Sequence, residues 1–222
     1  RTDRAALEDA MRESLKPLDL DEVLALQSEG AQILDVRDAA DFAGAHLAGS
    51  INVGLDGKYA TWCGTVLDKD KPIVVVAEEA QVEEAIMRLG RIGFDHVRGY
   101  LEHGPKALGP RPDAVAKVSR VTAKALQEQI DEHVPLTVVD VRAESEWDAG
   151  HIDGSINIPL NQLQGRIANI PGGPVVVHCK GGYRSSLAAS LLQREGRTQI
   201  SDLVGGIDAW KASRLPTTEP AS

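Results

Sequence analysis

The chain repeats itself, and this repeat limits how it can fold. The tripeptide Asp35-Val36-Arg37 returns as Asp140-Val141-Arg142, and segment 46–53 returns as 151–158, both 105 residues later. A third block, the apolar run at 72–76, returns 102 residues later at 174–178. Self-similarity at a nearly constant spacing indicates a duplicated structural unit. We therefore expect two domains of similar architecture.

The segment between the copies has a different composition. Residues 104–113 are rich in Pro and Gly and show no apolar period, which is typical of a linker. Leu7, Met11 and Leu15, spaced by four, favour a helix near the N-terminus. We divide the chain into an N-terminal extension at 1–16, a first domain at 17–104, a linker at 105–117, a second domain at 118–215 and a tail at 216–222.

Within each copy, apolar runs alternate with helical patterns. In the second copy, Thr122 is the expected N-cap of a helix at 123–130. Segments 136–141 and 175–178 are rich in β-branched residues and predict strands, and 160–170 has helical apolar spacing. Nearly apolar strands separated by helices are typical of a covered parallel sheet. The predicted fold class is α/β, with two tandem domains that each contain a parallel sheet with helices on both faces.

The most chemically specific segment is a cysteine loop in the second copy. Cys179 ends the apolar run that begins at Val175, and a helical pattern follows at 186–192. A loop between a strand and a helix N-terminus directs backbone N–H groups and the positive end of the helix dipole toward one point. Such surroundings favour the thiolate, which is the nucleophilic form of cysteine. We predict Cys179 as the catalytic residue, with a substrate-binding loop formed by Lys180, Gly181, Gly182, Tyr183, Arg184 and Ser185.

The first copy lacks this loop. Ala77 occupies the position of Cys179, and Val82 occupies that of Arg184. The intervening segment contains Glu78 and Glu79 and no glycine. Carboxylates at a helix N-terminus interact with the dipole themselves and repel an anionic substrate. The first domain is therefore expected to be inactive in this chemistry.

The composition indicates which classes of partner and which cellular compartment to expect. A net charge of −9 argues against nucleic acid as a main partner, and no apolar segment is long enough to span a membrane. The start at Arg1-Thr2-Asp3-Arg4 predicts no signal peptide, and the missing initiator Met is expected of a fragment, a processed piece or a trimmed chain. Only Cys63 and Cys179 are present, which excludes a disulfide scaffold and indicates the cytoplasm. With six scattered histidines, the sequence predicts no metal site and no cofactor.

Three blocks of the second copy resemble the rhodanese family of sulfurtransferases: Asp140-Val141-Arg142, Gly150 to Ile158, and Cys179 to Ser185. The resemblance covers nearly the whole chain, because the first copy shares two of the blocks. It implies that Cys179 takes sulfane sulfur from thiosulfate or a low-molecular-weight persulfide, forms a persulfide, and passes the sulfur to a thiophilic acceptor such as a thiol. The loop amides then hold the terminal sulfur, Lys180 and Arg184 attract the anionic donor, and Tyr183 points toward the acceptor.

Other interpretations of Cys179 stay open. Four residues separate Cys179 from Arg184, whereas the related cysteine phosphatases have five, a loop wide enough for a tetrahedral oxyanion. The shorter loop favours the binding of a single sulfur atom.

An alternative from a different functional class is a non-catalytic protein: a persulfide carrier, a sensor or a docking module of a larger sulfur-metabolism enzyme. Cys179 could also be a buried structural cysteine.

A finer resemblance concerns the first copy. Segments 59–64 and 91–101 look like the rhodanese modules that follow a metallo-β-lactamase-fold domain in persulfide dioxygenase fusions. The resemblance implies a fused or associated domain of that fold, and any dioxygenase chemistry would lie outside this chain.

Residues that recur in both copies are expected to be structural, because the first copy keeps them without the cysteine. Asp140 and Arg142 predict an ion pair or turn contact, and His46 and His151 predict turn-stabilising side chains. Strand alternation directs His178 away from the cysteine loop.

Overall fold

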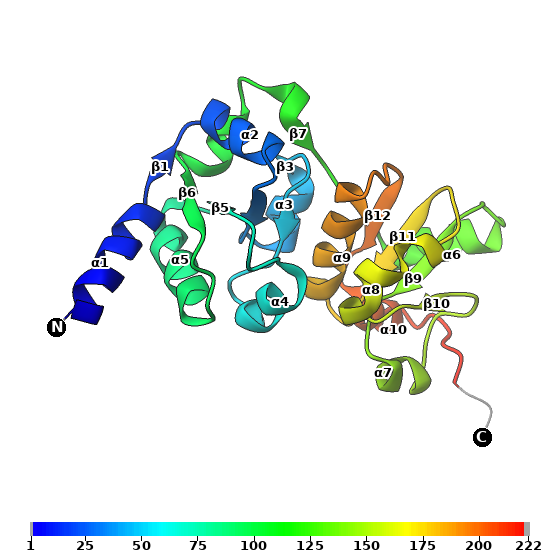
Figure 1. The fold of residues 1–222 in the computed structure, drawn as a ribbon. Coiled ribbons are helices and arrows are strands. Elements are labelled where there is room, and N and C mark those ends of the chain that lie inside the picture. The colour runs from blue at the N-terminus through cyan, green and yellow to red at the C-terminus, as the bar shows by residue number, and fades with distance from the viewer. Residues whose placement is uncertain (1, 220–222) are drawn as a thin grey trace. The chain divides into compact units, whose positions relative to one another are not determined.

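The computed structural model describes residues 2–219, which divide into two compact units at the boundary between Lys117 and Val118 (Figure 1). Each unit contains a five-stranded parallel sheet flanked by helices, so the predicted fold class is confirmed. Among the described residues, no helix has the length and apolar character needed to cross a membrane.

The first unit has the strand order β1-β6-β5-β2-β4. These strands are β1 (Pro17–Leu18), β2 (Gln32–Asp35), β4 (Ile51–Asn52), β5 (Ile73–Val76) and β6 (Val97–Leu101). The helices are α1 (Thr2–Ser14), α2 (Leu20–Ser28), α3 (Ala39–Gly44), α4 (Tyr59–Val66) and α5 (Val82–Arg91), with the 3-10 segments η1 (Glu79–Gln81), η2 (Gly104–Leu108) and η3 (Pro112–Ala114). Val74 and Val76 pack with α2 and η2 in one core cluster, which leaves the alternate side chains of β5 to face α5.

The second unit has the equivalent strand order, β8-β12-β11-β9-β10. These strands are β8 (Ser119–Val121), β9 (Thr137–Asp140), β10 (Ile156–Asn157), β11 (Val175–His178) and β12 (Ile200–Leu203). The helices are α6 (Ala123–Asp131), α7 (Glu144–Asp148), α8 (Leu160–Arg166), α9 (Tyr183–Arg194) and α10 (Gly206–Ala212), with η4 (Ile167–Asn169) after α8. Val176 and Leu203 pack with α6 and α10, whereas α9 lies along β11 and β12 (Figure 1).

The segment expected to be a linker is instead packed on the first unit. Leu108 and Ala114 are buried in its core cluster. Strand β7 (Val115–Ala116) pairs antiparallel with β3 (His46–Leu47). The apolar side chains between the Pro and Gly residues are too few to show a period, yet they are enough to dock the segment.

The described segments near the N- and C-termini also contact their own units. The predicted N-terminal helix is present as α1, which contacts β6. In the expected tail, Thr218 exchanges two backbone hydrogen bonds with His151, at 2.7 and 3.0 Å.

The recurring polar residues are structural, as expected. Arg142 Nη2 lies 2.6 Å from Asp140 Oδ2, both side chains are buried, and the guanidinium also donates to the Gly150 carbonyl at 2.9 Å. The His151 ring stacks on Trp147 with a centroid separation of 3.5 Å. Arg37 with Asp35 and His46 with Phe42 repeat these contacts in the first unit. Together they anchor the turns that follow β2 and β9.

A candidate active site around Cys179

Cys179 directly follows β11 at the carboxyl edge of the second sheet. Its side chain is 1% exposed, and α9 begins four residues later at Tyr183. Clefts at the carboxyl ends of parallel strands are the usual ligand sites of such sheets. The predicted nucleophile and the predicted loop therefore lie together between a strand and a helix N-terminus.

Two groups of the loop contact the sulfur. The Gly182 N–H donates to Cys179 Sγ at 3.1 Å, and Ser185 Oγ lies 3.6 Å from the same sulfur. Gly182 has φ 122°, in the region that favours glycine, and this conformation directs its N–H inward. Gly182 thus makes the predicted amide contact. Gly181 is exposed and Tyr183 is half-buried.

The two cations of the loop are each paired with a carboxylate. Arg184 donates to both Glu146 oxygens, at 2.7 and 3.0 Å, and these hydrogen bonds lower the Glu146 pKa to about 2. Lys180 Nζ lies 2.8 Å from Asp208 Oδ2, and both side chains are exposed. The attraction of the loop for an anion therefore depends on backbone N–H groups and the start of α9 more than on free positive side chains.

The first turn of α10 holds the cysteine loop in place by hydrogen bonds to its carbonyl groups. The N–H groups of Ile207 and Asp208 donate to the carbonyls of Cys179 and Lys180, at 2.9 and 3.1 Å. Gly206 has φ 59°, and a Cβ there would lie 2.5 Å from both carbonyl oxygens. Only glycine allows this approach. The consecutive glycines Gly205 and Gly206, which directly follow the apolar pair Leu203-Val204, are a sequence signal that could have identified this support.

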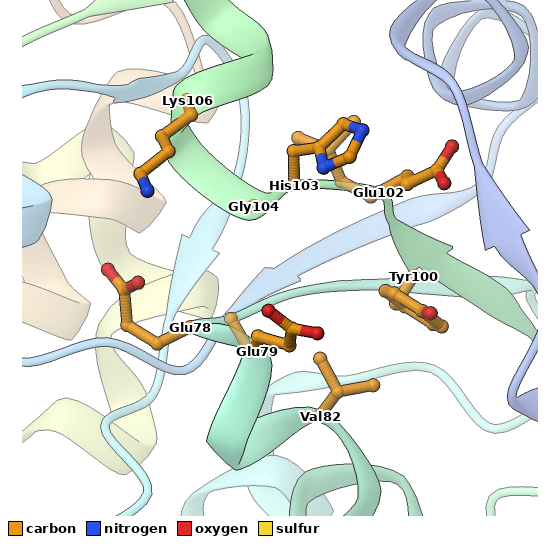
Figure 2. A pocket seen from close by; sticks show the side chains of 10 residues that line it. Glu78, Glu79, Val82, Tyr100, Glu102, His103, Gly104 and Lys106 are labelled. Carbon is orange, nitrogen blue, oxygen red and sulfur yellow. The ribbon is translucent and has the colours of Figure 1, made fainter.

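The corresponding place in the first unit keeps the close approach of a glycine and lacks the thiol. Gly104, with φ 54°, would place a Cβ 2.5 Å from the Ala77 carbonyl oxygen, just as Gly206 does beneath Cys179. A cavity of about 260 Å³ lies here, and Figure 2 shows Glu78 and Glu79 on one side of it and Glu102 on another. The cavity lining contains no cysteine and presents carboxylates to any bound molecule.

The second cysteine lies elsewhere in the first unit. Cys63 is on α4, is fully buried, and has a pKa raised to about 12 by burial. A thiol in this state is protonated at neutral pH, which is typical of a cysteine that packs in a core rather than reacts. Within residues 2–219, no group of three or more His, Cys, Asp or Glu side chains is arranged to hold a metal ion.

Replacing Gly206 with Ala tests the support beneath the loop. The added Cβ would overlap two carbonyl oxygens, so we expect the second unit to lose about 1–3 kcal/mol of stability and the Gly182–Cys179 contact to be disturbed. Gly154→Ala is the matched control, because Gly154 has φ 75° and open space around its Cβ position. Hydrogen exchange of peptides from β11 and α9 measures the difference. Equal effects of the two variants would show that backbone strain alone, and not the overlap, matters at Gly206.

The comparisons with known proteins agree with this architecture. A model of the rhodanese-like domain matches residues 19–106 and 122–213, which is more than half of the chain. The probable adenylyltransferase/sulfurtransferase MoeZ of Mycobacterium tuberculosis is 36% identical over 105 residues, which are 46% of this chain and 26% of that protein. A sulfurtransferase of Allochromatium vinosum is 29% identical over 104 residues, which are 46% of this chain and 97% of that protein.

Solved structures of rhodanese-related proteins also resemble this chain. A rhodanese-related protein from Thermoplasma volcanium shares 33% identity with a TM-score of 0.42, over 45% of this chain and 97% of that one. The chain spans about a quarter of the length of the Mycobacterium relative. Because the family model matches both units, the chain belongs to the rhodanese-like family and contains two tandem rhodanese-like domains.

Proposed function

We propose that the second unit transfers sulfane sulfur through a persulfide on Cys179. The observation that carries this proposal is the Gly182 N–H that faces Cys179 Sγ at 3.1 Å beside the start of α9. The sulfurtransferase names of the relatives support the same reaction class. We further propose thiosulfate or a low-molecular-weight persulfide as the donor.

The proposed reaction has two displacement steps. The Cys179 thiolate attacks the outer sulfur of the donor, an S–S bond forms on Cys179, and sulfite or a thiolate leaves with the electron pair of the broken bond. The loop N–H groups stabilise the negative terminal sulfur in the same way that an oxyanion hole stabilises oxygen. An acceptor thiolate then attacks the terminal sulfur, and Cys179 leaves as a thiolate.

The first unit takes no part in this cycle in our proposal. Ala77 replaces the nucleophile, and carboxylates line the cavity at that place. The resemblance of segments 59–64 and 91–101 to modules of persulfide dioxygenase fusions supports an association with a metallo-β-lactamase-fold domain. With both cysteines free, we propose a reducing compartment, the cytoplasm.

Turnover of thiosulfate with cyanide or a thiol tests the assigned nucleophile. Cys179→Ser is expected to abolish turnover, since the hydroxyl is a far weaker nucleophile toward sulfur. Cys63→Ala is the control and is expected to stay within about twofold of the parent, because a buried thiol in α4 takes no part. Activity that survives Cys179→Ser would refute the assignment. A persulfide that forms on Cys179 and never moves to an acceptor would favour a carrier.

Glu146→Gln tests the balance of charge at the loop. The change removes the carboxylate that neutralises Arg184 and keeps a hydrogen-bond acceptor of the same shape. We expect kcat/KM for anionic thiosulfate to rise by about 3- to 10-fold at low ionic strength, with a steeper decrease as salt is added. Glu144→Gln on the same helix is the control, because Glu144 is exposed. A fall in kcat/KM would show that Glu146 acts by positioning Arg184 rather than by neutralising it.

A further inference from the structure

A buried histidine lies directly before the nucleophile. His178 ends β11, is fully buried, and shares a face of the sheet with Val176, which packs toward α6 and α10. Strand alternation thus turns the ring away from the sulfur, yet the ring still contacts the backbone of the nucleophile. His178 Nδ1 lies 3.1 Å from the Cys179 carbonyl oxygen. The other ring nitrogen, Nε2, has no hydrogen-bond partner among the described residues.

The surroundings of the ring decide which of its nitrogens carries a hydrogen. Asp140 and Arg142 are charged side chains that act on the ring, and Nε2 lies 3.5 Å from Asp140 Oδ2. That carboxylate already accepts from the Arg142 guanidinium at 2.6 to 3.0 Å. Burial lowers the pKa of His178 and outweighs the opposite effect of Asp140, so the ring is neutral at pH 7 and has one N–H. The hydrogen-bond distance places that N–H on Nδ1, facing the carbonyl.

The Cys179 carbonyl therefore has two donors. From the first turn of α10, the Ile207 N–H donates to the same oxygen at 2.9 Å. A carbonyl oxygen has two lone pairs, so it accepts both hydrogen bonds at once. With the oxygen held, the planar peptide that joins Cys179 to Lys180 is fixed. This peptide begins the loop that returns the Gly182 N–H to the sulfur at 3.1 Å.

We propose that His178 is a positioning residue for Cys179, which holds the carbonyl of the nucleophile through Nδ1–H and so keeps the sulfur aligned with the Gly182 N–H. The ring acts from the face of the sheet opposite the sulfur, and no proton is transferred. Its effect on the rate is expected because a small displacement of a reacting atom slows a reaction substantially. The inference rests on the proposed function, since it concerns the same nucleophile.

The first unit provides an internal comparison. Val76 takes the place of His178 and lies opposite Asp35 in the sheet. The buried ion pair of Asp35 forms there all the same, so the pair does not require the histidine. Pro105 takes the place of Ile207, directly after the glycine that makes the close approach, and has no N–H to donate. The unit that lacks the nucleophile thus keeps the ion pair and neither of the two donors.

Three substitutions at this position test the inference by turnover of thiosulfate. His178→Val copies the first unit and removes the donor, so we expect kcat/KM to fall about 5- to 30-fold. We expect the free energy of unfolding to be no lower than that of the parent, because the unpartnered Nε2 is removed as well. His178→Asn places an amide N–H at the position of Nδ1 and is expected to recover kcat/KM to within about threefold of the parent.

His178→Gln is the matched control, because it places the amide at the position of Nε2, on the side of Asp140. We expect no recovery in this variant. Full activity in His178→Val, or equal recovery by the Asn and Gln variants, would overturn the inference. A parallel loss of activity and stability in His178→Val would also overturn it, since that result indicates a structural role.

Nuclear magnetic resonance of the ring nitrogens tests the contact without turnover. In isotope-labelled protein at pH 7, with His178→Asn used to assign the signals, we expect a hydrogen on Nδ1 and none on Nε2. A bare Nδ1 would overturn the inference, because it cannot donate to the carbonyl. A parent protein that forms no persulfide would instead refute the proposed function, and the ring nitrogens would still decide the contact.

Discussion

The cysteine loop depends on the contact between its carbonyl groups and the first turn of α10. The Ile207 and Asp208 N–H groups hold the carbonyls of Cys179 and Lys180, and the absence of a side chain at Gly206 lets the two segments meet. With these carbonyls directed toward α10, the Gly182 N–H is free to face the sulfur. The strand that ends just before Cys179 and the strand that leads to Gly206 are neighbours in the sheet, so the fold itself brings the two segments together.

The first unit shows which of these features occur without the cysteine. Gly104 beneath Ala77 repeats the close approach of Gly206 beneath Cys179. The buried Asp–Arg pairs and the stacked histidines also recur. What differs is the set of groups at the carboxyl edge of the sheet, where Ala77 and Val82 take the places of the thiol and the arginine and the segment between them carries Glu78 and Glu79 (Figure 2). A domain of this family can therefore keep its stable framework after its nucleophile is lost.

Local sequence patterns predicted the parts of the molecule that local interactions determine. The N-cap at Thr122 accepts from the Ala125 N–H at 3.2 Å, as its position before an amphipathic helix indicated. The strand ending near Cys179 and the helix behind it were evident from composition and period. The edge strand β8 was not, because Ser119 and Arg120 are polar and exposed and the strand is short.

The residues that contact the cysteine loop could not be predicted from the sequence, for a different reason. Glu146 and Gly206 are distant from Cys179 in sequence and reach the loop only through the sheet order. The pairing of Arg184 with Glu146 changes the electrostatics expected from the loop sequence alone.

The central claim is that one cysteine of this chain carries sulfur. Mass spectrometry of the whole chain and its peptides after mixing with thiosulfate or a persulfide tests it most directly. We predict a single added sulfur atom on the peptide that contains Cys179, and sulfur on Cys63, or turnover without sulfur on Cys179, would contradict the account.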